Sequence, residues 1–136
     1  MDWQVKYSVG IEEIDRHHQM FFEYFRRLDE AIKAGKGWSG PYYLIEQLHE
    51  YAKFHFAVEE AMMRMHGYPK AEQHAAIHRS FIDNIVTLEK KALNNDLTLE
   101  IADFMRRWLA EHICGDDMDY AHSFAARIEK LRSIKE

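Results

Sequence analysis

The sequence predicts an all-α protein, an up-down-up-down four-helix bundle with an N-terminal arm and a short C-terminal helix. Three observations support this prediction. Strand-like alternation is nearly absent, the 136 residues include only two prolines, and apolar residues recur over most of the chain at the three-and-four spacing of one helix face. Because the breaks between the helical stretches are short, neighbouring helices should run antiparallel. We expect residues 1–136 to form a single domain.

The first bundle helix is expected from Ile11 to Ile32, where the apolar positions form one stripe along about 20 residues. The glycine-rich segment 35–41 should end it, and Pro41 fits the first turn of the next helix. This second helix should end at Gly67, which precedes a proline by two residues.

The third helix is expected over about 71–92, and the segment Asn94-Asn95-Asp96 should form the next break. A fourth helix should run from about 98 to 113. Gly115 should interrupt the chain and let it turn before a last helix, expected from about Asp117 to Ser133. We expect the N-terminal arm and this last helix to be appendages packed on the bundle.

The composition is typical of a globular protein and argues against several functional classes. Hydrophobic residues make up 47% of the chain and charged residues 30%. The net charge of −5 argues against a nucleic-acid-binding face, and no apolar run approaches the ~20 residues of a membrane span. The N-terminus does not look like a secretory signal, and a lone cysteine, Cys114, excludes an intramolecular disulfide. We therefore expect a cytoplasmic protein.

Seven ionisable side chains occupy positions that should face the core of the bundle. They are His18, His55, Glu59, His74, His78, His112 and Asp117. Burying so many polar groups in one small core costs too much free energy unless something pairs with them. Residues four apart share a helix face, so His74 and His78 could hold one ion together. The same spacing joins His55 to Glu59. We therefore predict a metal site in the core.

The types of ligand favour iron. Seven protein ligands are too many for one tetrahedral zinc ion, and calcium or magnesium prefers oxygen ligands. Imidazoles with bridging carboxylates suit a pair of iron ions, which could share Glu59 and Asp117. Five histidines over two ions divide into three and two, so one iron would keep an open coordination position. A small molecule could bind there.

A set of motifs spans nearly the whole chain. They are Trp3, Tyr7-Ser-Val-Gly-Ile11, Ile14-Asp-Arg-His-His18, His55-Phe-Ala-Val-Glu-Glu60, Gly67-Tyr-Pro69, the pair His74 and His78, Trp108-Leu109 with His112-Ile113, and Asp117 with Tyr120. Together these motifs resemble the hemerythrin family, in the single-domain form that bacteria have.

This resemblance implies two iron ions bridged by an oxo or hydroxo group, Glu59 and Asp117. The six-coordinate iron would be held by His74, His78 and His112. The iron with the open position would be held by His18 and His55. The family binds dioxygen reversibly, so the resemblance implies dioxygen as the partner, a role in its storage, delivery or sensing, and a protein that is not an enzyme.

Four residues would wall the ligand pocket by the same resemblance: Phe56, Trp108, Leu109 and Ile113. Ordinary core packing explains these four residues equally well. Apart from the expected metal ligands, the inward positions carry aromatic and aliphatic side chains. They provide no additional acid near the site, and a dry apolar wall fits binding without further reaction.

Two residues near the expected ligands need a separate interpretation. His17 stands where the family usually has glutamine, and it lies about 100° round the helix from His18. We expect it at the surface or beside a ligand rather than on the metal. Cys114 is expected to be a small buried residue rather than a redox group or a ligand.

The remaining polar candidates have weaker assignments. Three histidines are expected to be mainly structural or exposed: His49, His66 and His122. Of these, His66 lies on the inward stripe of its helix, two turns past Glu59. Asp15 and Tyr120 are candidates for orienting the metal ligands through hydrogen bonds.

A di-iron enzyme is the rival interpretation: an oxidase, peroxidase or nitric oxide reductase would use the same metals. A ferritin-like ferroxidase predicts two Glu-x-x-His motifs. This chain has only one, Glu46-Gln-Leu-His49, and His49 lies about 240° round the helix from His55, away from the metal face. The ferritin-like version is therefore disfavoured, whereas peroxidase activity at the predicted site is left open.

Overall fold

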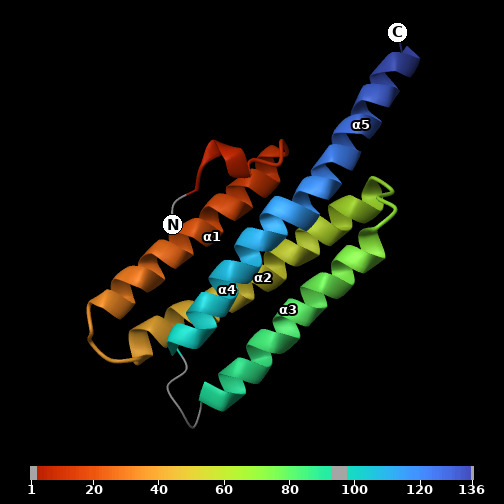
Figure 1. Ribbon diagram of the computed structural model, residues 1–136. Coiled ribbons are helices and arrows are strands. Elements are labelled where there is room, and N and C mark those ends of the chain that lie inside the picture. Colours follow the sequence, from red (N-terminus) through yellow and green to blue (C-terminus); the bar gives the residue numbers. More distant parts are fainter. Residues whose placement is uncertain (1–2, 93–97, 136) are drawn as a thin grey trace.

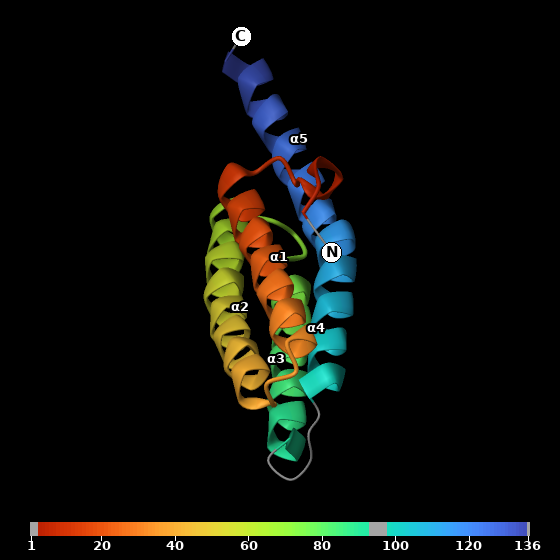
Figure 2. The same ribbon diagram turned by 90° about the vertical axis from the view of Figure 1, so that its left-hand side faces the viewer.

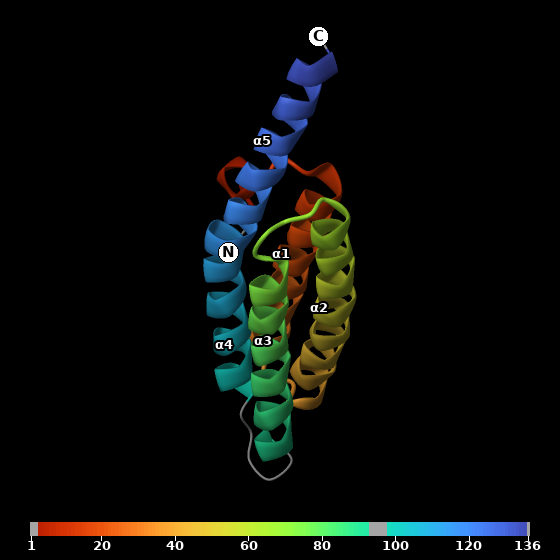
Figure 3. The same cartoon turned by 90° about the vertical axis from the view of Figure 1, so that its right-hand side faces the viewer.

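Four helices lie side by side with alternating direction in the computed structural model, which describes residues 3–92 and 98–135 (Figure 1). They are α1 (Glu12–Lys33), α2 (Ser39–Met65), α3 (Ala71–Ala92) and α4 (Thr98–His112). Figure 2 shows α1 in front of α3, and Figure 3 shows the opposite face with α3 in front. Helix α4 packs against both α3 and α1 and closes the bundle. The predicted fold class is confirmed.

The first two helices begin and end close to the predicted positions. The first turn of α1 carries Glu12, Glu13 and Asp15, whose charges favour the positive end of the helix dipole. Gly35 follows the end of α1 with a φ of +64°, a left-handed conformation that glycine adopts without strain. Pro41 lies in the first turn of α2, as predicted.

Helix α3 covers the predicted range 71–92, and α4 starts at Thr98. The break predicted at 94–96 lies outside the described residues. Gly67, with a φ of +67°, separates α2 from the start of α3.

The chain does not turn at Gly115, so this prediction was wrong. It continues from α4 through a π-helix, η2 (Ile113–Asp117), into α5 (Met118–Lys135). Gly115 is not among the glycines with a positive φ. A π-turn accommodates an extra residue while the helical hydrogen bonding continues, which is why no break is needed.

Helix α5 covers nearly the predicted range but is less packed than predicted. It has 18 residues, and it continues the line of α4 beyond the end of the bundle (Figure 1). Among its described side chains, only Tyr120 and Ala121 near its start are buried. It is therefore an extension of α4 rather than a helix packed on the bundle.

The N-terminal arm, which includes the short helix η1 (Val5–Tyr7), lies over one end of the bundle (Figure 2). Asp15 anchors it, because one carboxylate oxygen accepts the Ser8 hydroxyl and the other accepts the Val9 backbone N–H at 2.8 Å. Asp15 therefore holds the arm to α1. The expected hydrogen bond from Asp15 to a predicted metal ligand is therefore not formed.

Large apolar side chains fill the bundle below the polar site. The cluster includes Phe21, Phe25 and Leu28 of α1, Ile45 and Leu48 of α2, Phe81 and Ile85 of α3, and Ile101 and Met105 of α4. These residues come from the inward stripes that the helical periodicity predicted. Among the described residues, no helix is both long enough and apolar enough to cross a membrane.

Candidate metal centre

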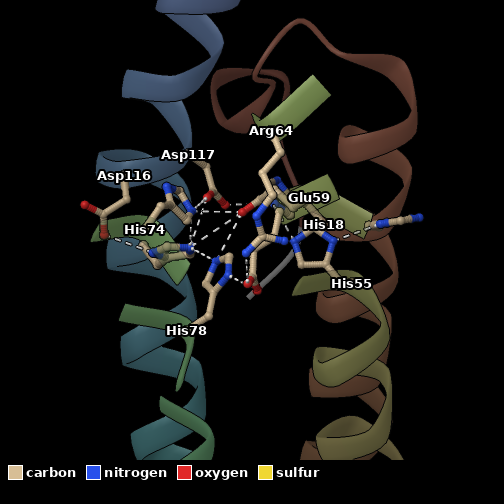
Figure 4. A network of polar contacts seen from close by, with 11 residues as sticks. His18, His55, Glu59, Arg64, His74, His78, Asp116 and Asp117 are labelled. Atoms are coloured by element: carbon tan, nitrogen blue, oxygen red, sulfur yellow. Dashed lines mark hydrogen bonds and ion pairs between the residues drawn. The ribbon is translucent and has the colours of Figure 1, made fainter. Parts of the chain in front are cut away.

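The structure brings together all seven ionisable residues that the sequence placed in the core. Each has at most 3% of its surface exposed. His18 comes from α1, His55 and Glu59 from α2, His74 and His78 from α3, His112 from the end of α4 and Asp117 from η2. Six of these side chains point toward one another between the helices in Figure 4: His18, His55, Glu59, His74, His78 and Asp117.

The seven residues form two overlapping groups, each with ligand atoms that lie within 4.8 Å of one another. The larger group consists of Glu59, His74, His78, His112 and Asp117. The smaller group consists of His18, His55, Glu59 and Asp117. Both carboxylates therefore belong to both groups, and the five histidines divide into three and two.

Each oxygen of Glu59 faces a different histidine group. Its Oε1 lies 2.9 Å from Nε2 of His74 and 3.2 Å from Nε2 of His78. Its Oε2 lies 3.3 Å from Nε2 of His55. Glu59 therefore spans the space between the two groups.

Asp117 has the same arrangement. Its Oδ1 lies 3.0 Å from Nε2 of His74 and 3.0 Å from Nε2 of His112. Its Oδ2 lies 3.1 Å from Nε2 of His18. The two carboxylates are thus equivalent in role, with one oxygen for each histidine group.

Several of these buried atoms have no hydrogen-bond partner. They are both ring nitrogens of His18, Oε2 of Glu59 and both carboxylate oxygens of Asp117. His18 and Asp117 approach to 3.1 Å, but not with the geometry of a hydrogen bond. Leaving buried polar atoms unpaired is costly, whereas a cation between them would satisfy several at once. The residues therefore fit a bound metal.

The pKa values reflect the same concentration of charge. Burial lowers the pKa of His112, but the charge of Asp117 and the hydrogen bond to Asp116 outweigh it and raise the pKa to about 10. Burial is likewise outweighed at His74, where the close Asp117 carboxylate and the hydrogen bond to Glu59 raise the pKa to about 9. Without metal, these two imidazoles hold the protons that balance the carboxylates.

The carboxylates respond in the opposite direction. Burial and the Asp117 charge raise the pKa of Glu59, but the contacts of His55 and His74 outweigh them and lower it. The pKa of Asp117 is also lowered, because its histidine partners outweigh the effect of burial. Both side chains are therefore ionised and ready to accept a cation.

Two acidic residues orient histidines of the candidate centre from the outside. Nδ1 of His78 donates to Oε2 of Glu60 at 3.1 Å, and Nδ1 of His112 donates to Oδ2 of Asp116 at 2.9 Å. Each bond leaves Nε2 of its histidine directed into the centre. Sequence reasoning missed both residues. Their place in the sequence could have indicated them, because Glu60 follows Glu59 directly and Asp116 directly precedes Asp117.

His17 lies beside the candidate ligand His55, which is one of the two locations expected for it. Its Nδ1 is 2.8 Å from Nδ1 of His55, and its side chain is half-buried. Tyr120 does not orient a ligand as expected, because its hydroxyl pairs with Nδ1 of His66 at 2.8 Å. The sequence analysis did not include Phe21 among the residues around the centre. Phe21 follows His18 by three residues on the same stripe of α1, and its ring lies 5.2 Å from the His55 ring.

Aromatic rings cover one side of the centre. The Phe56 ring stacks on His78 with centroids 3.9 Å apart and lies 5.7 Å from the His55 ring. The Trp108 ring stacks on His112 at 4.5 Å. Leu109 and Ile113 are buried in the same apolar cluster as Phe56. Of the four residues predicted as pocket walls, Phe56 and Trp108 therefore lie against histidines, and Leu109 and Ile113 belong to the buried core.

Cys114 is exposed, so the prediction of a small buried residue was wrong. The prediction rested on the residue type and on its place between two expected ligands. Cys114 follows His112 by two residues, which is slightly more than half a helical turn, so it lies on the side of the helix away from His112.

Comparisons with known proteins agree with this geometry. Residues 9–122 match the family described as the hemerythrin HHE cation binding domain. The chain is 30% identical to a bacteriohemerythrin of Stenotrophomonas maltophilia, over 95% of this chain and 84% of that one. It is 32% identical to a bacteriohemerythrin of Clostridium acetobutylicum (87% and 96% covered) and 31% identical to one of Pseudomonas aeruginosa (95% and 84% covered).

Proposed function

The chain belongs to the hemerythrin family, and on this premise we propose that it is a non-heme di-iron protein that binds dioxygen reversibly. One observation carries the proposal: the two histidine groups share both carboxylates. A single-ion site needs no such sharing, whereas two ions held side by side do. The biological role would be storage, delivery or sensing of dioxygen.

In this proposal the larger group would hold one iron through His74, His78 and His112. The smaller group would hold the other iron through His18 and His55. Glu59 and Asp117 would each offer one carboxylate oxygen to either group. The smaller group has one histidine fewer, so dioxygen would bind on the side of His18 and His55.

Bound iron would supply the electrons and the coordination position that reversible dioxygen binding requires. The protein supplies orientation and charge. Glu60 and Asp116 accept hydrogen bonds from the Nδ1–H groups of His78 and His112. These bonds hold the Nε2 atoms of the two rings toward the centre. Glu59 and Asp117 contribute two negative charges, which offset part of the charge of two cations in a buried site.

The walls favour binding over catalysis. Phe56, Leu109 and Ile113 are each at most 2% exposed and exclude water from the histidines. Trp108 adds an aromatic face against His112. With the carboxylates Glu60 and Asp116 engaged by ligand histidines, the apolar wall presents no acid that would drive a bound molecule on to a product. We therefore propose a binding protein rather than an enzyme.

We also propose a cytoplasmic location and no nucleic-acid partner. The only cysteine, Cys114, has no second cysteine in the chain with which to form a disulfide, which fits a reducing compartment. The net charge of −5 does not suit a phosphate-binding face.

Iron analysis combined with visible spectra tests the proposal. We expect two irons per chain and an oxygenated spectrum that disappears under vacuum and returns with air. Rapid autoxidation accompanied by turnover of a substrate would favour a di-iron oxidase, peroxidase or nitric oxide reductase instead. One zinc ion per chain and no iron would overturn the di-iron assignment.

The variant Glu59→Ala tests the bridging role directly. We expect it to lose iron or the stable oxygenated spectrum, because one oxygen for each ion disappears. Glu50→Ala, at an exposed position of the same helix, is the matched control and should behave as the original protein. A Glu59→Ala protein with two irons and an unchanged spectrum would contradict the assignment.

A further inference from the structure

His49 does not lie at the surface, although its phase on α2 points away from the metal centre. It is only 8% exposed. Its Nδ1 lies 2.9 Å from Oε1 of Glu89 on α3, and Glu46 precedes it by nearly one turn of α2. Each of these three residues offers one possible ligand atom, and the three atoms lie within 4.8 Å of one another.

This cluster is separate from the candidate metal centre. His49 precedes His55 by six residues on α2, which corresponds to about 9 Å along the helix. Glu89 follows His78 by eleven residues on α3, or about 16 Å. The cluster therefore lies toward the end of the bundle where α2 begins and α3 ends (Figure 1). The two sites share no residue.

We propose that Glu46, His49 and Glu89 form a second cation site, which binds one divalent transition-metal ion of the Zn²⁺ type. Two carboxylates and a neutral imidazole carry a combined charge of −2, which a divalent cation neutralises. A mixture of nitrogen and oxygen ligands suits zinc and its neighbours, whereas magnesium and calcium prefer oxygen alone. Three protein ligands leave a fourth position for water.

The two carboxylates need positive charge that the surroundings do not provide. Among the described residues, no lysine or arginine forms an ion pair with Glu46 or Glu89, although other acidic residues on the helices have such partners. Burial and the nearby Glu46 raise the pKa of Glu89, against the opposing effect of His49. A single imidazole lies near both carboxylates, and a divalent ion between the three groups would interact with all of them.

The helices hold the three residues in place. Residues three apart are neighbours on a helix surface, so Glu46 and His49 project from adjacent positions of α2. Glu89 faces them from α3, which packs directly against α2. Glu46 lies one turn after Tyr42 on the same helix, and burial followed by the charge of Glu46 raises the pKa of the Tyr42 hydroxyl. The site is thus built on two rigid elements.

Titration of the oxidised, iron-loaded protein with Co²⁺ tests the proposal. Co²⁺ is a spectroscopic probe for zinc-type sites, and the iron keeps the first centre filled. We expect one Co²⁺ per chain in addition to the iron, with visible absorption of the bound ion. Zn²⁺ should displace it, whereas Mg²⁺ at the same concentration should not.

The variants Glu46→Gln and Glu89→Gln keep side-chain size but remove one charge each. Both should weaken Co²⁺ binding at least tenfold while iron content and the oxygenated spectrum stay unchanged. His122→Ala, which removes an exposed histidine from α5, should bind Co²⁺ as the original protein does. Equal binding by all four proteins, no Co²⁺ beyond the iron, or displacement by Mg²⁺ would overturn the proposal.

The outcome is distinguishable from a failure of the di-iron proposal. If the protein holds no iron, the difference in Co²⁺ affinity between the original protein and Glu89→Gln still reports on this cluster alone. Thermal unfolding of each variant shows that it is folded. A folded Glu89→Gln protein with undiminished Co²⁺ binding would contradict the second site irrespective of what the first centre contains.

Discussion

Nε2 of His112 lies 3.0 Å from Oδ1 of Asp117, although the two residues are five positions apart along the chain. In a regular α-helix, residues five apart point about 140° away from each other. The π-helix η2 reduces this difference, because its hydrogen bonds join residues five apart and bring the two side chains toward one face. Asp117 can therefore contact His18 on the neighbouring helix α1 at the same time.

Loss of the Asp117 carboxylate should deplete both proposed iron positions. We expect Asp117→Ala to retain clearly fewer than two irons per chain, because each ion loses an oxygen ligand and the histidines lose their counter-charge. Iron analysis after purification measures this. Asp119→Ala, an exposed residue two positions on, should keep its iron. Equal iron in both variants would argue against a shared carboxylate at position 117.

Removal of the Glu60 carboxylate should weaken metal binding without removing a ligand. His78 would lose the acceptor that orients its ring, and such outer contacts typically contribute roughly 10–100-fold to metal affinity. We expect Glu60→Ala to release iron to a chelator correspondingly more readily. Glu72→Ala, exposed at the start of α3, is the control. Release at the control's rate would show that Glu60 does not act through His78.

The metal-free protein should become less stable as pH rises above neutrality. The folded pKa values of His74 and His112 are about 9 and about 10, compared with an ordinary value of 6.5. Because the folded state binds these protons more tightly than the unfolded state, their stabilisation is complete below pH 6.5 and is lost as pH rises toward 10. The Tm of the metal-free protein should fall over this window.

Two controls sharpen this measurement. The iron-loaded protein should show a much flatter profile, since metal replaces the protons on both imidazoles. His122→Ala should follow the original protein, because its imidazole is exposed. A metal-free Tm that stays constant or increases between pH 6.5 and 10 would contradict the assigned protonation of His74 and His112.

Two phenylalanines of α2, one buried and one exposed, distinguish the effect of the pocket wall from that of an apolar side chain at the surface. Phe56→Ala removes a buried ring that stacks on His78, so we expect a loss of about 3–5 kcal/mol in the free energy of unfolding and faster autoxidation. Phe54, two residues earlier, is 55% exposed. Phe54→Ala should change stability by about 0.5 kcal/mol or less. Similar autoxidation rates in both variants would mean that Phe56 does not shield the centre.

Helical periodicity was sufficient to predict most of the bundle and most of the candidate centre. The stripe through His18 and Phe21 on α1, and the pairs at spacing four on α2 and α3, all face the core as 3.6 residues per turn requires. These positions depend only on local helix geometry, which the pattern of apolar residues reveals directly. The starts of α2 and α3 were predicted from another local signal, the glycine and proline residues that precede or open each helix.

The periodicity could not predict what happens after His112. Nothing in the segment from Ile113 to Asp117 indicates a π-turn, so the sequence-based prediction used a turn at Gly115 to direct Asp117 toward the site. Contacts between distant segments were also invisible. The pairing of His49 with Glu89 joins residues 40 positions apart, and only the packing of α2 against α3 reveals it.

Because α4, η2 and α5 follow one another without a break, a rotation at the start of α5 would move the whole C-terminal helix. Asp117 sits at its base, directly before Met118. With a rise of about 1.5 Å per residue, a rotation of about 5° at Asp117 would move the far end of the 18-residue helix by about 2 Å. A small rotation of the helix at Asp117 would thus produce a larger displacement at the C-terminal end of α5.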